Sequence, residues 1–319
     1  MTPELSFIIV NWNGGDLLRR CIESIEVHRP TILCDIVVVD NASTDDTPAW
    51  LRARAADDSS GTTLRLIENA ENVGFGKANN QAFAATKSPL LFLLNPDAEL
   101  TPGACDTLIK TLFSGERIGA CGPRIVNLDG SLQISVWRNP PTAWATLLSG
   151  LRLASLLPGR LRGELLLAEH WDHKRRRRVT MLSGAAILVR RQVIDEVGGF
   201  DERFHMYGED NEWCLRISRS GWTLMFEPDA VVTHRGAHGS TQRWTNLEKL
   251  RVQTEAYLKF LDLTLPRHKV IANLLASASM LSLQRAFNRL KGRRRDDVET
   301  VLSLHRQALK RALSNQRNS

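Results

Sequence analysis

Four apolar runs alternate with helix-patterned segments over the first hundred residues, and this alternation is the strongest constraint on the fold. The runs lie in LSFIIVNWN, CDIVVVD, TTLRLIE and PLLFLLNPD. Each run is continuously apolar, whereas a strand exposed on one face would alternate, so parallel strands covered on both faces are predicted. The segments between them, such as GDLLRRCIESIEVH, carry apolar residues at helical spacing. The sequence therefore predicts right-handed β-α-β units in a mostly parallel α/β sheet flanked by helices.

Polar residues and glycines gather where each of these strands ends. In chain order they are Asn11 and Asn13, then Asp40 and Asn41, then Asn72 and Gly74, then Asn95, Asp97 and Glu99. Any one cluster alone is explained by a polar turn. Ligands of such sheets bind at the carboxyl ends of the strands, so four successive clusters predict one binding site. No G-x-G-x-x-G follows the first strand, which argues against the usual dinucleotide-binding fold.

The later part of the chain breaks this rhythm. Residues 139–180 combine prolines, leucine-rich stretches and a basic run, which indicates an insertion or lid whose leucines form either helix cores or membrane-surface contacts. VTMLSGAAILVRR is then predicted as a strand, EDNEWCLRISRSGW as a helix, and TLMFEPDAVVTHRGAHGS as a pair of strands. Residues 246–319 are basic and helical in propensity, which leaves a main domain over residues 1–245 and a helical C-terminal extension.

Charge and cysteine content narrow the class of protein. The net charge of +7 is concentrated in the basic runs 173–178 and 289–295. Nucleic acid or an anionic membrane surface would attract such runs, and a solvated basic face without a dedicated partner is the third reading. The runs lack the interleaved aromatic residues of a single-strand-binding platform, which argues against nucleic acid. Five scattered cysteines without a C-x-x-C pair fit reduced thiols in a cytosolic protein. No apolar stretch reaches the roughly 18 to 20 residues of a spanning helix, and no signal peptide is expected.

Seven short motifs resemble those of family 2 inverting glycosyltransferases, in order and in spacing. They are FIIVNWN, VVVDNASTD, NVGFGKANN, FLLNPDAEL, LSGAAILVRR, GGFDERFHMYGEDNEWCLR and HRGAHGS, and they span roughly residues 4–245. The likeness is strongest to the rhamnosyltransferase branch, which builds bacterial cell-surface polysaccharide. The resemblance implies a glycosyltransferase A-type fold, Rossmann-like in its nucleotide-binding part, with a mixed, mostly parallel sheet.

The resemblance also implies where a nucleotide sugar and its metal bind. Asp40 matches the aspartate that binds the imide N–H of uracil or thymine, although it would equally cap the turn that follows. Asp97 matches the carboxylate that holds Mg²⁺ or Mn²⁺ across the diphosphate, with His234 beside it and His238 as a weaker candidate. The first acid of the family's D-x-D motif is here Asn95. The other nucleotide-sugar contacts fall on Val10, Asn11, Asn13, Asn41, Asn72, Gly74, Asn79, Asn95 and Gly184.

The pair Glu209 and Asp210 matches the catalytic carboxylates of the family, with Asp210 as the general base. Such a base must approach the acceptor hydroxyl within roughly 2.6 to 3.2 Å. The alternative is that both acids are favoured by the dipole at a helix N-terminus. Glu212 replaces a further family aspartate and is assigned no role. Gly184 is expected to let the backbone approach the donor sugar, because glycine has no Cβ.

The expected activity is transfer of L-rhamnose from dTDP-rhamnose to a saccharide acceptor linked to polyprenyl diphosphate, by single displacement with inversion. UDP-hexose or UDP-galactofuranose transfer remains an alternative. So does a catalytically inactive nucleotide-sugar-binding protein, which the missing first aspartate of the metal motif motivates. The protein is expected to be cytoplasmic and peripheral at the inner face of the cell membrane. Its C-terminal helices would pair with another subunit or with the bilayer.

Overall fold

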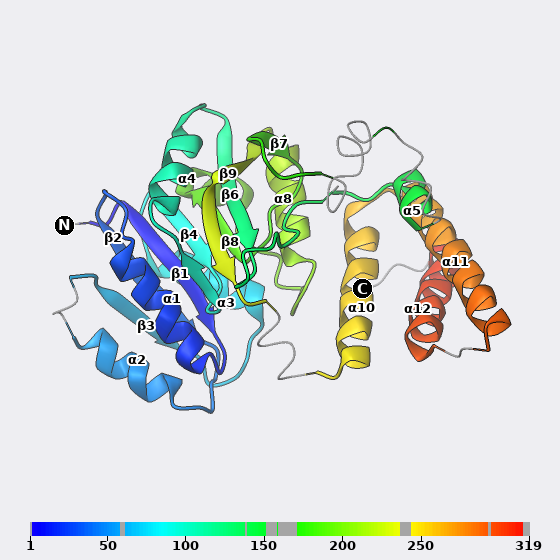
Figure 1. Cartoon of the computed structure of the whole chain (residues 1–319), viewed down its shortest axis with the longest axis horizontal. Helices are drawn as coiled ribbons and strands as arrows, with labels where there is room; N and C mark the ends of the chain where they lie inside the picture. Colours follow the sequence, from blue (N-terminus) through cyan, green and yellow to red (C-terminus); the bar gives the residue numbers. More distant parts are fainter. Residues whose placement is uncertain are drawn as a thin grey trace. The chain divides into compact units, whose positions relative to one another are not determined.

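The computed structural model describes residues 2–57, 61–137, 139–150, 158, 171–236, 244–292 and 295–314. Contacts between residues divide the chain into two compact units. One comprises Met1–Trp137 and His173–Gln242, and the other comprises Arg138–Asp172 and Arg243–Ser319. The first unit contains the sheet, and the second is helical where it is described (Figure 1). His238, the weaker metal candidate, lies outside the described residues, as do the leucine-rich positions 151–157 and 159–170.

Within the described residues, nine strands form one mixed sheet in the order β3-β2-β1-β4-β8-β6-β9-β5, with β7 paired to β9. The strands are β1 (Leu5–Asn11), β2 (Cys34–Asp40), β3 (Leu64–Glu68), β4 (Leu90–Leu94), β5 (Ala98–Leu100), β6 (Ile118–Val126), β7 (Arg177–Val179), β8 (Ala186–Arg190) and β9 (Thr223–His234). The first four strands pair in parallel, which confirms the prediction from their apolar runs. Antiparallel β8 then joins them to the second half of the sheet.

Helices cover the sheet on both faces. Those of this unit are α1 (Gly15–Val27), α2 (Thr47–Ala55), α3 (Phe75–Ala85), α4 (Ala104–Phe113), α7 (Arg191–Val197) and α8 (Glu209–Arg219). Leu18 of α1 and Leu108 of α4 pack in one core cluster with Phe7 and Ile9 of β1. The intervening residue Ile8 is buried outside that cluster. Successive strand residues point to opposite faces, so both faces of β1 are covered.

Two strand predictions were wrong in detail. The predicted strand VTMLSGAAILVRR is divided between β7 and β8 by a turn in which the N–H of Ala186 donates to the carbonyl of Ser183 (3.2 Å). The segment predicted as two strands forms the single strand β9, whose pairing with β6 shifts in register between Pro123 and Arg124. Pro228 in β9 has no N–H to give to the ladder. An irregularity at this point lets the strand continue past the proline.

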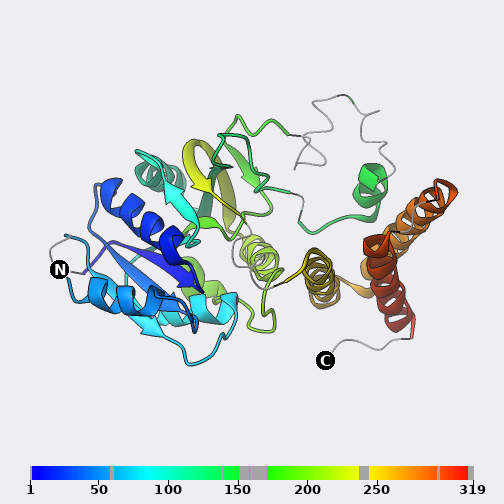
Figure 2. The same ribbon diagram turned by 60° about the horizontal axis from the view of Figure 1, so that its bottom comes forward.

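The second unit contains α5 (Ala143–Gly150), α10 (Asn246–Thr264), α11 (Arg267–Leu290) and α12 (Asp296–Leu313). This confirms the predicted helical C-terminal extension. Thr245 and Glu248 form a capping box that fixes the start of α10. Helix α11 contacts both α12 and α5, and Figures 1 and 2 show α11 and α12 side by side. Among the described residues, α11 is the one helix whose length and apolar composition would allow it to cross a bilayer.

Gly74 occupies a backbone position that only glycine fits. Its φ of 91° and ψ of 165° lie in a region open almost only to glycine. A Cβ at Gly74 would lie 2.6 Å from the backbone oxygen of His205. Gly103, at φ 72°, has no atom within 4 Å of the corresponding position, so it offers a control for backbone strain alone.

We expect Gly74→Ala to lower the free energy of unfolding by about 2 to 4 kcal/mol, because strain and a backbone clash add. Gly103→Ala should cost only about 1 kcal/mol, from the left-handed backbone conformation. Urea denaturation of both variants measures the difference. Equal losses at the two positions would show that the approach of His205 does not constrain this turn.

Candidate active site

The ends of β1 and β2 are joined through Asn11, Asp40 and Ser43. The side-chain amide of Asn11 donates to Asp40 Oδ1 (2.8 Å) and to Ser43 Oγ (3.0 Å). Ser43 donates its N–H to Asp40 Oδ2 (3.0 Å) and its hydroxyl to Oδ1 (2.6 Å). Asp40 therefore caps the turn after β2, which was the alternative to a binding role. A carboxylate has about four lone-pair sites, so these three donors leave one for a further donor.

The loop between β3 and α3 is fastened to the end of β2 by Asn41. Its amide nitrogen donates to Asn72 Oδ1 (3.1 Å), and its amide oxygen accepts from the N–H of Val73 (3.0 Å). Asn72 Oδ1 also accepts from the N–H of Gly74 (3.1 Å). The second and third strand-end clusters therefore form one hydrogen-bonded unit.

Asp97 and His234 face each other across the pairing of β5 and β9. Asp97 Oδ1 lies 3.1 Å from His234 Nε2, and both side chains are largely buried. The amide nitrogen of Asn95 lies 3.4 Å from the same Nε2. Sequence analysis predicted this pair as metal ligands, and the structure places the two groups in contact although they are 137 residues apart.

Gln133 determines which nitrogen of His234 carries a hydrogen. The Gln133 amide nitrogen donates to Asn127 Oδ1 (2.9 Å) and to the carbonyl of His234 (3.4 Å), so its amide oxygen faces the ring. That oxygen lies 2.6 Å from His234 Nδ1, which must therefore be the donor. In the neutral ring, Nε2 then presents a lone pair towards the Asp97 carboxylate. Two such groups repel unless a proton or a cation lies between them.

This arrangement fits a divalent cation. A carboxylate oxygen and an imidazole nitrogen are accepted ligands of Mn²⁺ and, for the oxygen, of Mg²⁺. The 3.1 Å between Asp97 Oδ1 and His234 Nε2 is short enough for both atoms to bind one ion. In the described chain no group of three or more His, Cys, Asp or Glu side chains could hold a metal. Any further ligands would come from substrate oxygens, from water or from residues outside the described part of the chain, where the candidate His238 lies.

Asp210 lies in the first turn of α8 and is oriented by three donors. Its Oδ2 accepts from the N–H of Gly184 (3.2 Å), and its Oδ1 accepts from the N–H of Asn211 (2.8 Å) and from that residue's amide nitrogen (3.2 Å). The indole N–H of Trp137 donates to Asn211 Oδ1 (3.0 Å), which fixes the amide. A Cβ on Gly184 would lie 3.5 Å from the Cβ of Asp210 and 3.6 Å from its Oδ2, which are ordinary contact distances, so the expected role of Gly184 at the donor sugar stays a prediction.

Burial raises the pKa of both acids at this helix end. Desolvation, and then the charge of Asp210, raise the pKa of Glu209 to about 8. Desolvation also raises the pKa of Asp210, against the hydrogen bonds from Gly184 and Asn211, which lower it. Glu209 Oε2 is buried without a hydrogen-bond partner among the described residues. Glu209 is therefore expected to stay protonated near neutral pH.

Two backbone contacts link these clusters into one network. The N–H of Phe75, next to Gly74, donates to the carbonyl of His205 (3.2 Å), four residues before Glu209. The N–H of Asn95 donates to the carbonyl of Ala185 (2.9 Å), next to Gly184. The residues predicted to bind the diphosphate and the metal thus adjoin the predicted general base, around the carboxyl ends of the parallel strands.

The remaining predicted residues have more local contacts. Asn13 holds the loop after β2 by accepting from the N–H of Thr44 (2.7 Å), and Val10 lies in β1 opposite Val39. Asn79 is buried and donates back to the carbonyl of Phe75 in its own helix (2.9 Å), so its role in ligand binding stays a prediction. Glu212 pairs with Arg216 (2.7 Å), in keeping with its exclusion from the site.

Sequence reasoning missed Gln133, Asn211 and Trp137. Gln133 follows the turn NLDGS, whose Asp-Gly pair is a hairpin signal that would have returned the chain along β6. The N–H of Gln133 donates to the carbonyl of Ile125 (2.9 Å), which completes that return. No local signal indicates that Trp137 reaches Asn211, because 74 residues separate them.

The fold is that of known glycosyltransferases. The chain resembles a structure titled GalNAc-T7 with UDP, GalNAc and Mn²⁺, with a TM-score of 0.57 and 18% identity over 82% of this chain and 51% of that one. It also resembles the mannosyltransferase PcManGT from Pyrobaculum calidifontis in complex with GDP-Man and Mn²⁺, with a TM-score of 0.53 and 19% identity over 99% and 87%. These likenesses show the fold, and the predicted glycosyltransferase A-type architecture is confirmed.

Sequence comparison adds the family. The model described as Glycosyl transferase family 2 matches residues 6–198, more than half of the chain, and one described as Glycosyl transferase family group 2 matches residues 164–288. The N-acetylglucosaminyl-diphospho-decaprenol L-rhamnosyltransferase of Mycobacterium tuberculosis is 31% identical over 255 residues, which are 75% of this chain and 78% of that protein. The chain is a nucleotide-sugar glycosyltransferase. It belongs to glycosyl transferase family 2, as its motifs predicted.

The raised pKa of Glu209 predicts a pH-dependent stability. Between its ordinary value of 4.5 and about 8, the folded state holds a proton that the unfolded state releases. The free energy of unfolding should therefore fall as the pH rises through this window, by at most about 1.4 kcal/mol per pH unit from this group. Glu209→Gln removes this titrating group and should make the free energy of unfolding less dependent on pH. Urea denaturation from pH 5 to 8.5 measures the change.

Glu248→Gln is the matched control for this measurement. Hydrogen bonds from Thr245 lower the pKa of the exposed Glu248 carboxyl, so this group is ionised in the folded state across the window and in the unfolded state titrates only around its ordinary value of 4.5. The control should keep the slope of the unaltered protein. The same slope in Glu209→Gln would contradict a protonated, buried Glu209.

Loss of the Gln133 amide should weaken metal binding at His234. Gln133→Leu removes the acceptor that fixes the Nδ1–H tautomer, and removal of such a supporting bond commonly costs about 10- to 100-fold in metal affinity. Electron paramagnetic resonance of Mn²⁺, titrated in the presence of dTDP, gives the affinity. Ser131→Ala perturbs the same hairpin without contact to His234 and should leave the affinity unchanged. Equal losses in both variants would count against the orienting role.

Proposed function

We propose that this chain is an inverting rhamnosyltransferase that uses dTDP-L-rhamnose and a saccharide acceptor linked to a polyprenyl diphosphate, in cell-surface polysaccharide biosynthesis. The observation that supports it most is the contact network from Asp97 and His234 through Asn95 and Ala185 to Asp210. Through this network the Asp97–His234 pair, proposed to bind a cation, adjoins the oriented carboxylate of Asp210 in a nucleotide-sugar transferase fold. The name of the mycobacterial relative supports the sugar and the lipid-linked acceptor.

The nucleotide would bind along the ends of β1 and β2. Asp40 keeps one acceptor site beyond the three donors that hold it, and the imide N–H of thymine or uracil is a donor of the required kind. Asn11 pairs with Asp40 in the sheet, with Val10 next to it in β1, while Asn13 follows the end of β1 and Asn41 follows Asp40 directly. Asn72, Gly74, Asn79 and Gly184 would extend the contact to the ribose, the phosphates and the sugar.

Asp97 and His234 would hold Mg²⁺ or Mn²⁺ at the diphosphate. When bound, the ion supplies Lewis-acid stabilisation of the negative charge on the departing nucleoside diphosphate. The chain's own contribution is orientation, because Gln133 directs the Nε2 lone pair of His234 towards Asp97. Both structural relatives named above were solved with Mn²⁺, which supports a divalent cation here.

Asp210 would act as the general base. Burial raises its pKa, and a stronger base removes a proton from a sugar hydroxyl more readily. Hydrogen bonds from Gly184 and Asn211 fix the direction of its carboxylate. The acceptor oxygen would then attack the anomeric carbon on the face opposite the nucleotide. Protonated Glu209 would keep a second negative charge away from Asp210 at neutral pH.

A UDP-linked hexose or galactofuranose is the alternative donor. The imide N–H that Asp40 would accept is common to uracil and thymine, so this contact does not select between them. The low-salt glycan biosynthesis hexosyltransferase Agl10 of Haloferax volcanii is 27% identical over 223 residues, 69% of this chain and 63% of that protein. Thermal stabilisation by each nucleotide sugar identifies the donor, because tighter ligands raise the unfolding temperature further at equal concentration.

Asp210→Asn should abolish transfer without abolishing donor binding. Loss of a general base lowers kcat by about 10²- to 10⁴-fold, while the amide keeps the shape of the side chain. Transfer is followed with dTDP-rhamnose, Mg²⁺ and a lipid-linked N-acetylglucosamine acceptor, and donor binding by calorimetry. Glu212→Gln alters a carboxylate of the same helix that pairs with Arg216, and it should keep transfer. Full activity in Asp210→Asn would refute the assignment, and binding without turnover in the unaltered protein would favour an inactive binder.

The protein is also proposed to work in the cytoplasm, at the inner face of the cell membrane, where polyprenyl-linked acceptors are held. The support is the lipid-linked acceptor in the name of the mycobacterial relative and the excess of basic residues in this chain.

A further inference from the structure

Phe75, the first residue of α3, belongs to a cluster of four aromatic side chains. The other three, Phe83, Phe200 and Trp213, are buried, with 4%, 4% and 0% of their surface exposed, whereas Phe75 is partly exposed. The ring of Phe75 meets that of Phe200 edge-on, with centroids 5.8 Å apart and planes at 64°. This contact holds the ring in place from the core side. A partly exposed phenylalanine is common on protein surfaces, so exposure alone indicates no function.

The position of this ring is more informative, because it adjoins the proposed general base. A Cβ on Gly184 would lie 3.6 Å from Phe75 Cε1 and 3.6 Å from Asp210 Oδ2, so ring and carboxylate flank the same face of Gly184. Oδ1 of Asp210 accepts two of the hydrogen bonds described above and Oδ2 accepts one. Oδ2 therefore keeps a lone pair for a substrate hydroxyl. The apolar ring lies near the oxygen at which the reacting groups would meet.

The loop that carries Phe75 runs from the proposed nucleotide contacts to the proposed base. At one end Asn72 accepts from the amide of Asn41, which directly follows Asp40 (3.1 Å). At the other end the N–H of Phe75 donates to the carbonyl of His205 (3.2 Å). A nucleotide sugar with its base at Asp40 and its reacting carbon near the general base would extend along this loop. Phe75 would then lie at the sugar end of the donor.

We propose that Phe75 is a specificity-determining residue that contacts the donor sugar and favours a 6-deoxyhexose over a hexose. In a pyranose only the ring oxygen separates C5, which carries C6, from the anomeric carbon, so a side chain near the reacting centre is within reach of C6. The methyl group of a 6-deoxyhexose packs on an aromatic ring without losing a hydrogen bond. The C6 hydroxyl of a hexose would lose its water there.

This inference rests on the proposed function for the role of Asp210 and for the direction in which the donor lies. It adds the group that selects the sugar. The proposed contact of Asp40 with the base cannot make that selection, because uracil and thymine offer the same imide N–H.

The test compares dTDP-L-rhamnose with dTDP-L-mannose, which differs from it only by a hydroxyl on C6. The unaltered protein should prefer the rhamnose donor about 10- to 100-fold in calorimetric affinity and in kcat/KM, the range over which an apolar site rejects an added hydroxyl. Phe75→Gln offers hydrogen-bonding groups in place of the ring and should lower this preference about tenfold or more. Phe75→Leu keeps an apolar side chain and should keep most of the preference.

A purely structural role of Phe75 gives a different result. Loss of packing against Phe200 would lower the affinity for both donors by the same factor and leave their ratio unchanged. Phe83→Leu is the control for packing, because Phe83 also stacks on Phe200, with centroids 6.0 Å apart, but is buried. It should keep the ratio. An unchanged ratio in Phe75→Gln, or an equal change in Phe83→Leu, would overturn the proposal.

Gly184→Ala tests the same contact if Phe75→Gln does not fold. Its Cβ would make ordinary contacts with Phe75 and Asp210, so we expect this variant to fold. The added methyl group narrows the space beside the ring. The affinity for dTDP-L-rhamnose should fall about tenfold or more, while the affinity for dTDP, which has no sugar, stays the same. Undiminished affinity for dTDP-L-rhamnose would overturn the proposal.

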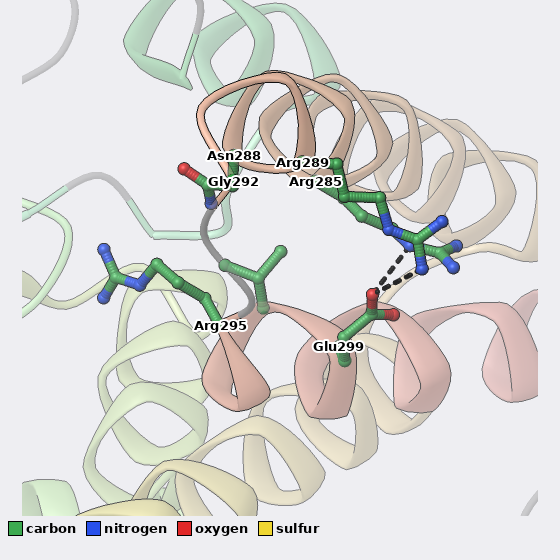
Figure 3. A pocket seen from close by; sticks show the side chains of 7 residues that line it. Arg285, Asn288, Arg289, Gly292, Arg295 and Glu299 are labelled. Atoms are coloured by element: carbon green, nitrogen blue, oxygen red, sulfur yellow. Dashed lines mark hydrogen bonds and ion pairs between the residues drawn. The ribbon is translucent and has the colours of Figure 1, made fainter.

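A second control lies in the helical unit, at a pocket of about 230 Å³ where α11 meets α12 (Figure 3). Figure 3 shows Arg285 and Arg289 directed at Glu299, at 2.8 and 3.2 Å. Arg295, across the pocket, pairs with Asp297 (2.7 Å). Each of these arginines has a carboxylate partner, so the pocket offers no uncompensated guanidinium to a donor diphosphate. Arg289→Gln should leave donor affinity unchanged. A loss as large as that in Phe75→Gln would overturn the proposal.

Failure of this inference and failure of the proposed function give different results. If rhamnose transfer depends on Asp210 but the donor ratio does not respond to Phe75→Gln, the inference fails and the proposed function stands. If the unaltered protein binds dTDP-L-rhamnose but transfers it to no acceptor, the proposed function fails, and the calorimetric ratio still decides the role of Phe75. Tighter binding of UDP-hexoses than of both dTDP donors would refute both.

Discussion

The turn from Ser183 to Ala185 joins the end of β4, next to the Asp97–His234 pair, to the proposed base Asp210. Its carbonyl at Ala185 accepts from Asn95 at the end of β4, and its N–H at Gly184 donates to Asp210 at the start of α8. One turn of the chain therefore fixes the distance between the Asp97–His234 pair and the proposed base. Both are backbone contacts, so they do not depend on the choice of side chain at Ser183 or Ala185. A Cβ at position 184 would meet Asp210 at an ordinary contact distance, so neither contact depends on glycine there.

The parallel half of the fold was predictable because its signal is local. Continuous apolar runs in β1, β2 and β4 reflect burial on two faces, and the polar residues after them mark the binding edge. The second half was less predictable. The division between β7 and β8, and the single strand β9, depend on which distant strand supplies the ladder. Such pairing is decided by tertiary contacts, and apolar pattern alone does not report it.

The contrast between local signals and tertiary contacts also applies to the site residues: sequence could identify those in local motifs, but not those placed by distant contacts. Asp97, His234 and Asp210 stand in recognisable motifs, whereas Gln133 contacts His234 across 101 residues and Trp137 contacts Asn211 across 74. These supporting residues act through hydrogen bonds to side chains far away in the sequence, so their amino-acid type is the only local sign of their role. A glutamine after a hairpin turn is too common a feature to identify such a contact without coordinates.

Asn95 stands where the family's D-x-D motif has its first aspartate, and this changes the charge around the Asp97–His234 pair. Asn95 brings a neutral amide to within 3.4 Å of His234 Nε2, where an aspartate would bring a second negative charge. On the proposed assignment, one carboxylate and one imidazole bind a divalent ion weakly by themselves, because hard cations favour several oxygen ligands. The diphosphate supplies those oxygens and two further negative charges. Cation and nucleotide sugar would then bind with positive cooperativity, each raising the affinity of the site for the other.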